Sequence, residues 1–276
     1  MPLLWKKSKS RTTSRKFIVK KMRIISWNVN GIRAAIRKGL NEFITKMNPD
    51  ILMLQEIRCL EEQLPKDWGA PLNLSYYWHP AEKKGYSGVA TFSNKSFETI
   101  EKGKGTEDPE GRILVTKHDN LILINTYLPS GSSKVERQLF KEKWMDEYLN
   151  WSLNYVDLDC PVIIAGDLNI AHTENDIWNP SGNKNTSGFL PNEREWFNKL
   201  LNLGWVDICR EKFGEKKGPY SWWSNRGRAR ILDRGWRIDY FLANKPAVKL
   251  ISHAEINREG GLIVSDHAPV IIDLNL

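Results

Sequence analysis

Cysteine is scarce in this chain of 276 residues, and Cys59, Cys160 and Cys209 lie far from one another. There is no CxxC pair and the count is odd, which argues against a disulfide framework or a zinc site. Long hydrophobic runs are also lacking, since none approaches the roughly 18 residues that a membrane span needs. The apolar start at residues 2–5 is too short for a secretion signal. These absences predict a soluble intracellular protein with buried thiols.

Acidic residues are missing from one segment only. Residues 1–21 carry eight lysines or arginines and no acid. Without these eight, the 41 basic residues fall to 33 and equal the 33 acidic ones, so the net charge of +8 belongs to this segment. A basic stretch rich in serine and threonine buries too little apolar surface to fold. We expect residues 1–21 to be a disordered extension, which leaves an upstream start codon, a nucleic-acid arm and a targeting peptide as open readings.

The rest of the chain has neither a Walker loop, nor a GxGxxG motif, nor a tandem repeat. It does have apolar material for a large core, with 41% hydrophobic residues and twelve tryptophans. Short Ile- and Val-rich runs predict strands that are covered on both faces. These runs are 23–27, 51–55, 89–93, 113–117, 121–127, 161–165, 236–243 and 269–274. Two stripes at helical spacing, Ile32 to Met47 and Phe140 to Trp151, predict core-facing helices. We expect residues 22–276 to form a single layered α/β domain.

Polar side chains follow many of these runs at the point where each strand should end. Asparagines, carboxylates, a tyrosine and a histidine all occur there: Asn28, Asn30, Glu56, Tyr127, Asp167, Asn169, Asp239, Asp266 and His267. In α/β sheets, side chains at the ends of strands converge on a common crevice. The sequence therefore predicts one polar site built from segments that are far apart in the chain.

Each of these residues has an ordinary structural reading when taken alone. Asparagine and aspartate cap helices and form turns, and a glutamate after a strand often makes a surface ion pair. The set as a whole suits phosphoryl transfer, which needs oxygen ligands for a hard cation, donors for phosphate oxygens and a base for water. The spacing predicts a Mg²⁺-dependent phosphodiesterase and does not name its substrate.

Seven motifs then identify a family. In chain order they are SWNVNGIRA (26–34), LQEIRC (54–59), GYSGVA (85–90), GDLNIAH (166–172), NPSGNKNTSGF (179–189), GWRIDYF (235–241) and SDHAP (265–269). Together they resemble the exonuclease III family of abasic-site endonucleases, within the DNase I-like endonuclease/exonuclease/phosphatase superfamily. The resemblance covers residues 22–276. GDLN and SDH occur across the superfamily, whereas NPSGNKN, the Trp222–Trp223 pair and GWRIDYF are specific to the family.

The resemblance implies a four-layered α/β sandwich of two packed mixed β-sheets flanked by helices, with the site at one edge. It also implies roles for the residues at the strand ends. The catalytic group would be Tyr127, Asp167, Asn169, Asp239 and His267, with Asp167 acting on the attacking water and Asp239 orienting His267. The ligands of Mg²⁺, or of Mn²⁺ as a substitute, would come from Asn28, Glu56, Asp167, Asn169, Asp266 and His267, with Glu56 as the principal one.

The same resemblance implies a DNA-binding surface. An apolar slot for a flipped-out abasic sugar would consist of Trp222, Trp223, Trp236 and Ile238. Contacts to the DNA backbone would come from Arg33, Arg58, Tyr86, Arg112 and Asn183. An arginine-rich loop beside the tryptophans would face DNA, through Arg226, Arg228, Arg230, Arg234 and Arg237. A solvated basic loop is the alternative reading of those arginines.

The resemblance implies a DNA repair phosphodiesterase that incises 5′ to abasic sites and leaves a 3′ hydroxyl, with 3′→5′ exonuclease and 3′-end-cleaning activity. Its partner would be double-stranded DNA with abasic sites or blocked 3′ ends, and we expect a monomer that does not bind membranes. We expect the cytoplasm, near the nucleoid, for a prokaryotic source, and the nucleus or an organelle for a eukaryotic one. The alternative is an inactive DNA- or protein-binding scaffold, which should have lost charged members of the set. Asn30 stands where some family members have an acid, which leaves the number of metal ions open.

Overall fold

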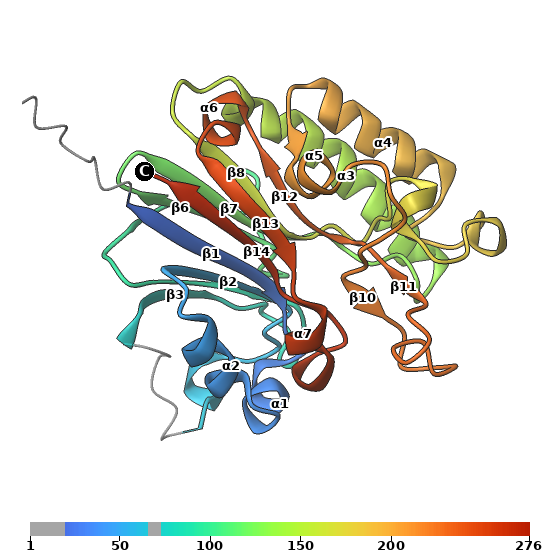
Figure 1. Cartoon of the computed structure of the whole chain (residues 1–276), viewed down its shortest axis with the longest axis horizontal. Helices are drawn as coiled ribbons and strands as arrows, with labels where there is room; N and C mark the ends of the chain where they lie inside the picture. Colours follow the sequence, from blue (N-terminus) through green and yellow to red (C-terminus); the bar gives the residue numbers. More distant parts are fainter. Residues whose placement is uncertain (1–19, 66–72) are drawn as a thin grey trace, which may run out of the picture.

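The computed structural model describes residues 20–65 and 73–276. Two six-stranded sheets form its centre (Figure 1). The first runs in the order β13 (Ile251–Ile256), β14 (Val270–Asn275), β1 (Lys21–Asn28), β2 (Ile51–Gln55), β4 (Val89–Ser93) and β3 (Ser75–His79). The second runs in the order β5 (Glu98–Lys102), β6 (Ile113–His118), β7 (Leu121–Tyr127), β8 (Val162–Asp167), β12 (Asp239–Ala243) and β9 (Val206–Asp207). A small third sheet pairs β10 (Trp222–Trp223) with β11 (Gly235–Trp236).

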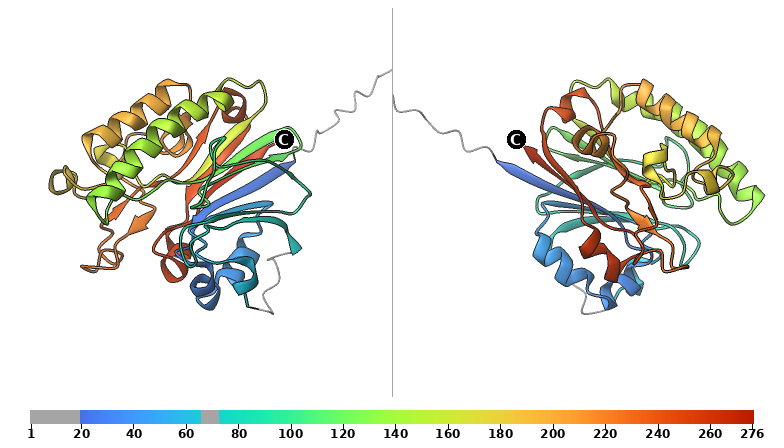
Figure 2. Two further views of the ribbon diagram at one scale, coloured as in Figure 1. Left: turned by 180° about the vertical axis from the view of Figure 1, so that it is seen from behind. Right: turned by 45° about the vertical axis from the view of Figure 1, so that its right-hand side comes forward.

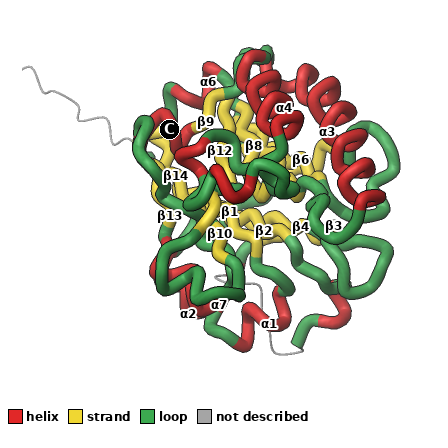
Figure 3. The backbone as a smooth tube through the Cα atoms, turned by 90° about the vertical axis from the view of Figure 1, so that its right-hand side faces the viewer, coloured by secondary structure: helices red, strands yellow, loops and turns green. Residues whose placement is uncertain are grey.

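Helices cover the outer face of each large sheet, as Figures 2 and 3 show from other directions. The helices are α1 (Ile32–Arg37), α2 (Leu40–Met47), α3 (Val135–Val156), α4 (Pro191–Asn202), α5 (Ile208–Phe213), α6 (Lys245–Val248) and α7 (Arg258–Val264), with short 3₁₀ turns η1 (Glu61–Gln63), η3 (Glu174–Asp176) and η4 (Ser181–Asn183). None of the helices among the described residues is both long and apolar enough to cross a bilayer.

The buried side chains show why the layers form. Successive residues of a strand face opposite sides of its sheet. Thus Ile24 of β1 packs in the core between the sheets, while Ile25 packs beneath α1 and α2. On the other side, Trp144 and Tyr148 of α3 pack on the second sheet. β1 and β2 are parallel, as are β7 and β8, while the other pairs in the two large sheets are antiparallel. The expected sandwich of two mixed sheets flanked by helices is confirmed.

Several local expectations need correction. The run 236–243 is not one strand, because β11 ends at Trp236 and β12 begins at Asp239. The stripe from Ile32 to Met47 is two helices, broken at Gly39, whose φ of +98° is a left-handed conformation that glycine tolerates. Phe140 is exposed on α3, with the guanidinium of Arg137 over its ring.

The structure bears on the expected basic extension, residues 1–21, only at its last two residues. Residues 1–19 lie outside the described residues. Lys21, however, opens β1 and pairs with Asn275 of β14. The first strand thus begins one residue before Met22.

Candidate active site

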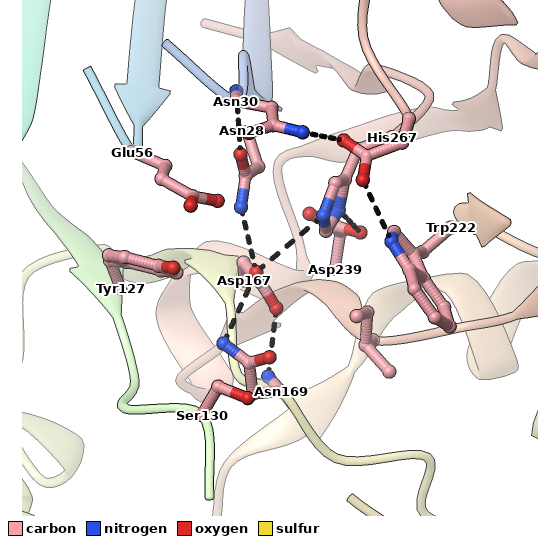
Figure 4. Close-up of polar contacts among 12 residues, drawn as sticks. Asn28, Asn30, Glu56, Tyr127, Ser130, Asp167, Asn169, Trp222, Asp239 and His267 are labelled. Carbon is pink, nitrogen blue, oxygen red and sulfur yellow. Dashed lines mark hydrogen bonds and ion pairs between the residues drawn. The ribbon is translucent and has the colours of Figure 1, made fainter. Parts of the chain in front are cut away.

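The strand-end residues meet around one cavity of about 880 Å³. It is lined by thirteen of the residues expected at the site: Asn30, Glu56, Arg58, Tyr86, Arg112, Tyr127, Asp167, Asn169, Trp222, Trp236, Ile238, Asp266 and His267. Both sheets contribute, since Glu56 follows β2 of the first sheet and Tyr127 and Asp167 end β7 and β8 of the second. Figure 4 shows how the side chains of the polar cluster gather there, with Asp167 between Asn28, Asn169 and His267.

Asp167 is at the centre of the polar cluster and is almost fully buried. Its Oδ2 accepts a hydrogen bond of 2.9 Å from Nδ2 of Asn28, and its Oδ1 accepts one of 2.8 Å from the backbone N–H of Asn169. Burial, and after it the charge of Asp239, raise the pKa of Asp167 above its ordinary value. A carboxylate of raised basicity at this position is suited to take a proton from water.

His267 and Asp239 form a buried pair beside Asp167. Nδ1 of His267 lies 2.9 Å from Oδ2 of Asp239, which also accepts a hydrogen bond of 2.6 Å from the hydroxyl of Ser221. Nε2 of His267 lies 3.9 Å from Oδ2 of Asp167. Burial alone lowers the pKa of His267, but Asp239 and the neighbouring carboxylates outweigh it and raise the pKa to about 10. The imidazole is therefore cationic at neutral pH and fixed in orientation.

Glu56 lies in an unusual backbone conformation. Its φ is +56°, in the left-handed region that costs a residue with a Cβ about 1–2 kcal/mol. The hydrogen bonds from Gly31 N–H to Glu56 O and from Arg58 N–H to Ser87 O hold the segment in this shape. Conformations of this kind persist where the surrounding structure enforces them, often at functional sites. Here the left-handed backbone places the Glu56 carboxylate at the cavity, in an ion pair with Arg58.

Asn30 and Asp266 form a hydrogen-bonded pair that also lines the cavity. Nδ2 of Asn30 donates a hydrogen bond of 2.8 Å to Oδ1 of Asp266, and Nε1 of Trp222 donates one of 3.3 Å to Oδ2. Burial by itself raises the pKa of Asp266, but His267 and the Asn30 amide outweigh it, so the pKa lies below its ordinary value. Asp266 is therefore an anion that reaches both the polar cluster and the slot.

Tyr127 forms the opposite wall. Burial, followed by the charge of Glu56, raises the pKa of Tyr127 well above its ordinary value, so the hydroxyl keeps its proton and acts as a donor. The guanidinium of Arg112 lies 4.7 Å from the ring centroid and donates to the backbone oxygen of Tyr127. Arg112 is also nearly buried and ion-paired with Glu110. Its access to a ligand is therefore through the cavity only.

An apolar slot lies next to the polar cluster. Trp222 and Trp236 face each other across β10 and β11, with ring centroids 6.0 Å apart and planes at 87°. Ile238 and Phe189 pack with them. Trp223 does not belong to this slot, because it points the other way and is fully buried in the core between the sheets. Strand alternation in β10 explains the difference.

Several expected DNA contacts do not line the cavity, among them Arg228, Arg230 and Arg234 of the arginine-rich loop. Arg33 lines a neighbouring pocket of about 410 Å³ together with Asn30, Arg37 and Arg58. Asn183 is bound to the backbone of Asn179, and Arg226 is exposed on the 224–234 loop. Arg237 is corrected from a loop arginine to a core residue, since it is fully buried and ion-paired with Asp176 and Asp207.

The donor set fits a divalent metal. Carboxylate and amide oxygens of Glu56, Asp266 and Asn28 are hard ligands of the kind Mg²⁺ prefers. Oδ1 of Asp239 is buried without a hydrogen-bond partner among the described residues, and Asp167, Asp239 and His267 place one ligand atom each within 4.8 Å of one another. His267 in its cationic form is a donor suited to a phosphate oxygen, and it could ligate the metal, as the resemblance implied, only in its neutral form.

Some residues of the site were not predicted from the sequence. Ser221 binds Asp239, and Trp27 donates from its indole N–H to the backbone oxygen of His267. Ser130 and Arg137 line the cavity. Only Trp27 lies within a motif, SWNVNGIRA, and its role is to orient a backbone oxygen, which a sequence motif does not reveal.

Comparison with known proteins agrees with this geometry. A model of the endonuclease/exonuclease/phosphatase family matches residues 25–267. The chain is 38% identical to an exodeoxyribonuclease of Bacillus subtilis, over 92% of this chain and all of that one. It is 35% identical to a DNA repair nuclease of Danio rerio, over 99% of this chain and 88% of that one.

Solved structures show the same relationship. A 3′ phosphatase from Neisseria, bound to a product DNA hairpin, has a TM-score of 0.84 at 26% identity, covering 92% of this chain and all of that one. An AP endonuclease from Archaeoglobus fulgidus has a TM-score of 0.82 at 27% identity, with the same coverage. The resemblance read from the motifs is confirmed: this chain is a hydrolase of the endonuclease/exonuclease/phosphatase family and belongs to its exonuclease III group of DNA repair nucleases.

Proposed function

We propose that this protein is a Mg²⁺-dependent endonuclease that hydrolyses DNA on the 5′ side of abasic sites and leaves a 3′ hydroxyl. One observation carries the proposal: the cluster of Asp167 and His267 opens into the same cavity as the slot of Trp222 and Trp236. The polar cluster suits any phosphodiester. The apolar slot beside it suits a substrate whose scissile phosphate adjoins a small apolar group, such as a deoxyribose without its base.

The residues divide the hydrolysis between them. Asp167 orients a water molecule and accepts its proton as the water oxygen bonds to phosphorus. His267 and Tyr127 are donors for the phosphate oxygens, and Asn169 holds Asp167 in place. The bond from phosphorus to the 3′ oxygen breaks and this oxygen takes up a proton from solvent, which gives a 3′ hydroxyl on one side and a 5′ phosphate on the abasic residue. A Mg²⁺ ion held by Glu56, Asp266 and Asn28 would supply positive charge that stabilises the transition state.

The slot gives the selectivity for damage. A nucleotide without a base loses little stacking energy when it leaves the helix, so its extrusion costs less than that of an intact nucleotide. Trp222 and Trp236 offer faces on which the sugar packs and occupy the volume that a base would need. Selectivity then follows from shape and does not need hydrogen bonds to a base.

The same machinery supports activity at 3′ ends. A recessed or blocked 3′ end also presents a phosphodiester or phosphate next to a deoxyribose, so we propose 3′→5′ exonuclease and 3′-end-cleaning activity as well. Arg58, Tyr86 and Arg112 line the cavity, and Arg33 lines the pocket next to it, which suits contacts to the DNA backbone on either side. An inactive scaffold is disfavoured, because all the charged members of the set are present and face one another.

The test uses purified protein, Mg²⁺ and three duplexes: one with a single abasic-site analogue, one undamaged and one with a recessed 3′ end. We expect incision at the analogue to exceed cutting of undamaged DNA by orders of magnitude, and the product to be extended by a DNA polymerase because it carries a 3′ hydroxyl. Equal cutting of damaged and undamaged duplexes, or a product that cannot be extended, would contradict the proposal.

A further inference from the structure

A buried ion pair lies behind the site and belongs to none of the roles described so far. Nζ of Lys141, on α3, lies 2.6 Å from Oε1 of Glu193, on α4, and both side chains are completely buried. Removing two charges from water is costly, and replacing such a pair with apolar residues is often neutral or stabilising. Stability alone therefore gives no reason for a charged pair here, and its other contacts become informative.

Lys141 connects the pair to Asn169, in the loop that follows β8. Its Nζ donates a second hydrogen bond, of 2.9 Å, to the backbone oxygen of Asn169. Asn169 has a left-handed φ of +51°, and its N–H and amide both point at Asp167. The carbonyl belongs to the peptide unit after Asn169, so a donor on it helps to hold the left-handed backbone conformation of the residue that makes these contacts. Lys141 therefore helps to set how Asn169 is presented to Asp167.

Glu193 connects the pair to the slot. Its Oε2 accepts hydrogen bonds from the backbone N–H groups of Gly188 and Leu190, at 2.6 and 3.0 Å. Gly188 has a φ of +94°, and a Cβ there would lie 3.2 Å from the ring of Trp236. The Gly188 backbone thus lies close against the ring of Trp236 at the edge of the cavity, and Glu193 fixes that backbone.

We infer that Lys141 and Glu193 are positioning residues that join the phosphate-hydrolysing loop at Asn169 to the support of the slot at Gly188, and thereby align cleavage with the abasic sugar. The inference rests on the proposed function for the meaning of the slot. It assigns different effects to the two residues. The contact from Lys141 to Asn169, called the Lys141 arm, affects turnover, and the contact from Glu193 to Gly188, called the Glu193 arm, affects selectivity.

Two double variants separate the arms. Lys141→Met with Glu193→Gln removes both charges and the donor to Asn169, while the glutamine oxygen still accepts from Gly188. We expect its kcat to fall by about 10- to 100-fold, the usual result of losing one charge-assisted hydrogen bond, with KM within about threefold and selectivity unchanged. Lys141→Met with Glu193→Met also loses the acceptor for Gly188. We expect the same loss of kcat together with a lower preference for abasic over undamaged duplex.

Two controls exclude a purely structural role. Leu200→Ala, a buried core residue on the same helix α4, should lower the melting temperature without lowering the kcat of the folded protein. Lys141→Arg keeps donors for both Asn169 and Glu193 and should retain kcat within about threefold of the original protein. If the double variants do not fold, Lys141→Gln/Glu193→Gln, a neutral pair in which the shorter residue 141 cannot reach both partners, takes the place of the first one with the same expected results.

The measurements are thermal unfolding and steady-state kinetics with Mg²⁺ on abasic, undamaged and recessed duplexes. A kcat within twofold of the original in Lys141→Met/Glu193→Gln, or a loss matched by Leu200→Ala, would overturn the inference. Unchanged selectivity in the Glu193→Met variant would overturn its second arm. If the unmodified protein cuts recessed ends and leaves abasic duplexes intact, the proposed function fails, while kcat on recessed ends still tests the Lys141 arm.

Discussion

Asn28 donates a hydrogen bond of 2.9 Å to Asp167 and so joins the two sheets at the point where both end in the site. Asn28 is the last residue of β1 in the first sheet, and Asp167 is the last residue of β8 in the second. Glu56 and His267 reach the cavity from the first sheet, and Asp239 reaches the site from the second. The catalytic geometry therefore depends on the packing of one sheet on the other.

Asn28→Leu should lower turnover more than stability. The change removes a buried donor to Asp167 Oδ2, and a buried charge that loses one hydrogen bond costs about 1–3 kcal/mol, equivalent to about a 5- to 150-fold loss of kcat. The matched control is Asn244→Ala, a buried asparagine at the opposite end of β8 that binds the backbone N–H of Val162. It should lower the melting temperature with kcat unchanged. A kcat loss in Asn244→Ala as large as in Asn28→Leu would contradict this assignment.

His267 and Asp239 should behave as one unit. Each single change, His267→Ala or Asp239→Asn, should lower kcat by about 10²–10⁴-fold, because each removes an oriented cationic donor. The double change should cost little more than the worse single one, since groups that act together are non-additive. Measuring kcat for the unmodified protein, the two single variants and the double variant completes a double-mutant cycle. Losses that multiply fully would mean that the contact between the two residues does not contribute to turnover.

The strand ends were predictable from the sequence because apolar runs and the polar residues after them are local features. The runs 51–55, 89–93 and 121–127 match β2, β4 and β7 residue for residue. β5 was missed because it is a polar edge strand with alternating exposure, Glu98–Lys102. An edge strand of this kind has one covered face and no continuous apolar run.

The sequence predicts many of the residues that form the site, but not which way their side chains point. Trp222 and Trp223 are adjacent and identical, yet one faces the slot and the other is core. Their directions depend on the pairing of β10 with β11, which is a long-range contact. Arg237 lies in a run of arginines but is bound by Asp176 and Asp207, which are 61 and 30 residues away in the chain. Sequence spacing carries no information about partners of this kind.

Trp222→Ala and Trp236→Ala should reduce activity on abasic DNA and relax the discrimination against undamaged DNA. Loss of packing on the sugar should cost about 1–3 kcal/mol in kcat/KM on the abasic duplex, by analogy with base stacking. Trp205→Ala is the matched control, since this ring is buried in the core between sheet and helices. It should cost about 3–5 kcal/mol of stability and leave discrimination unchanged. Early melting with unchanged discrimination in the Trp222 and Trp236 variants would mean that both rings are core.

His118 should make the protein sensitive to mild acid. Burial lowers the pKa of His118 to about 4, so the folded protein keeps the ring neutral while the unfolded chain protonates it below about 6.5. The unfolded state binds more protons in this window, so stability is full above pH 6.5 and falls as the pH drops toward 4. The contribution lost between pH 7.5 and 5 is about 2 kcal/mol. Melting curves should show a smaller acid loss in His118→Gln, and an equal loss in both proteins would contradict the assignment.

The most direct test of metal-dependent hydrolysis by this site is the rate at which the abasic duplex is cut, measured across a Mg²⁺ titration for the unmodified protein and for Glu56→Gln. The glutamine side chain of the variant has the shape of glutamate without its charge, and a hard cation needs that charge. We expect no cutting in a chelator, recovery with Mg²⁺ or Mn²⁺, and a rate at least about 100-fold lower in Glu56→Gln at ordinary Mg²⁺, with the melting temperature retained. Cutting in the chelator, or an unchanged rate in Glu56→Gln at ordinary Mg²⁺, would contradict the central role of this carboxylate and of the metal.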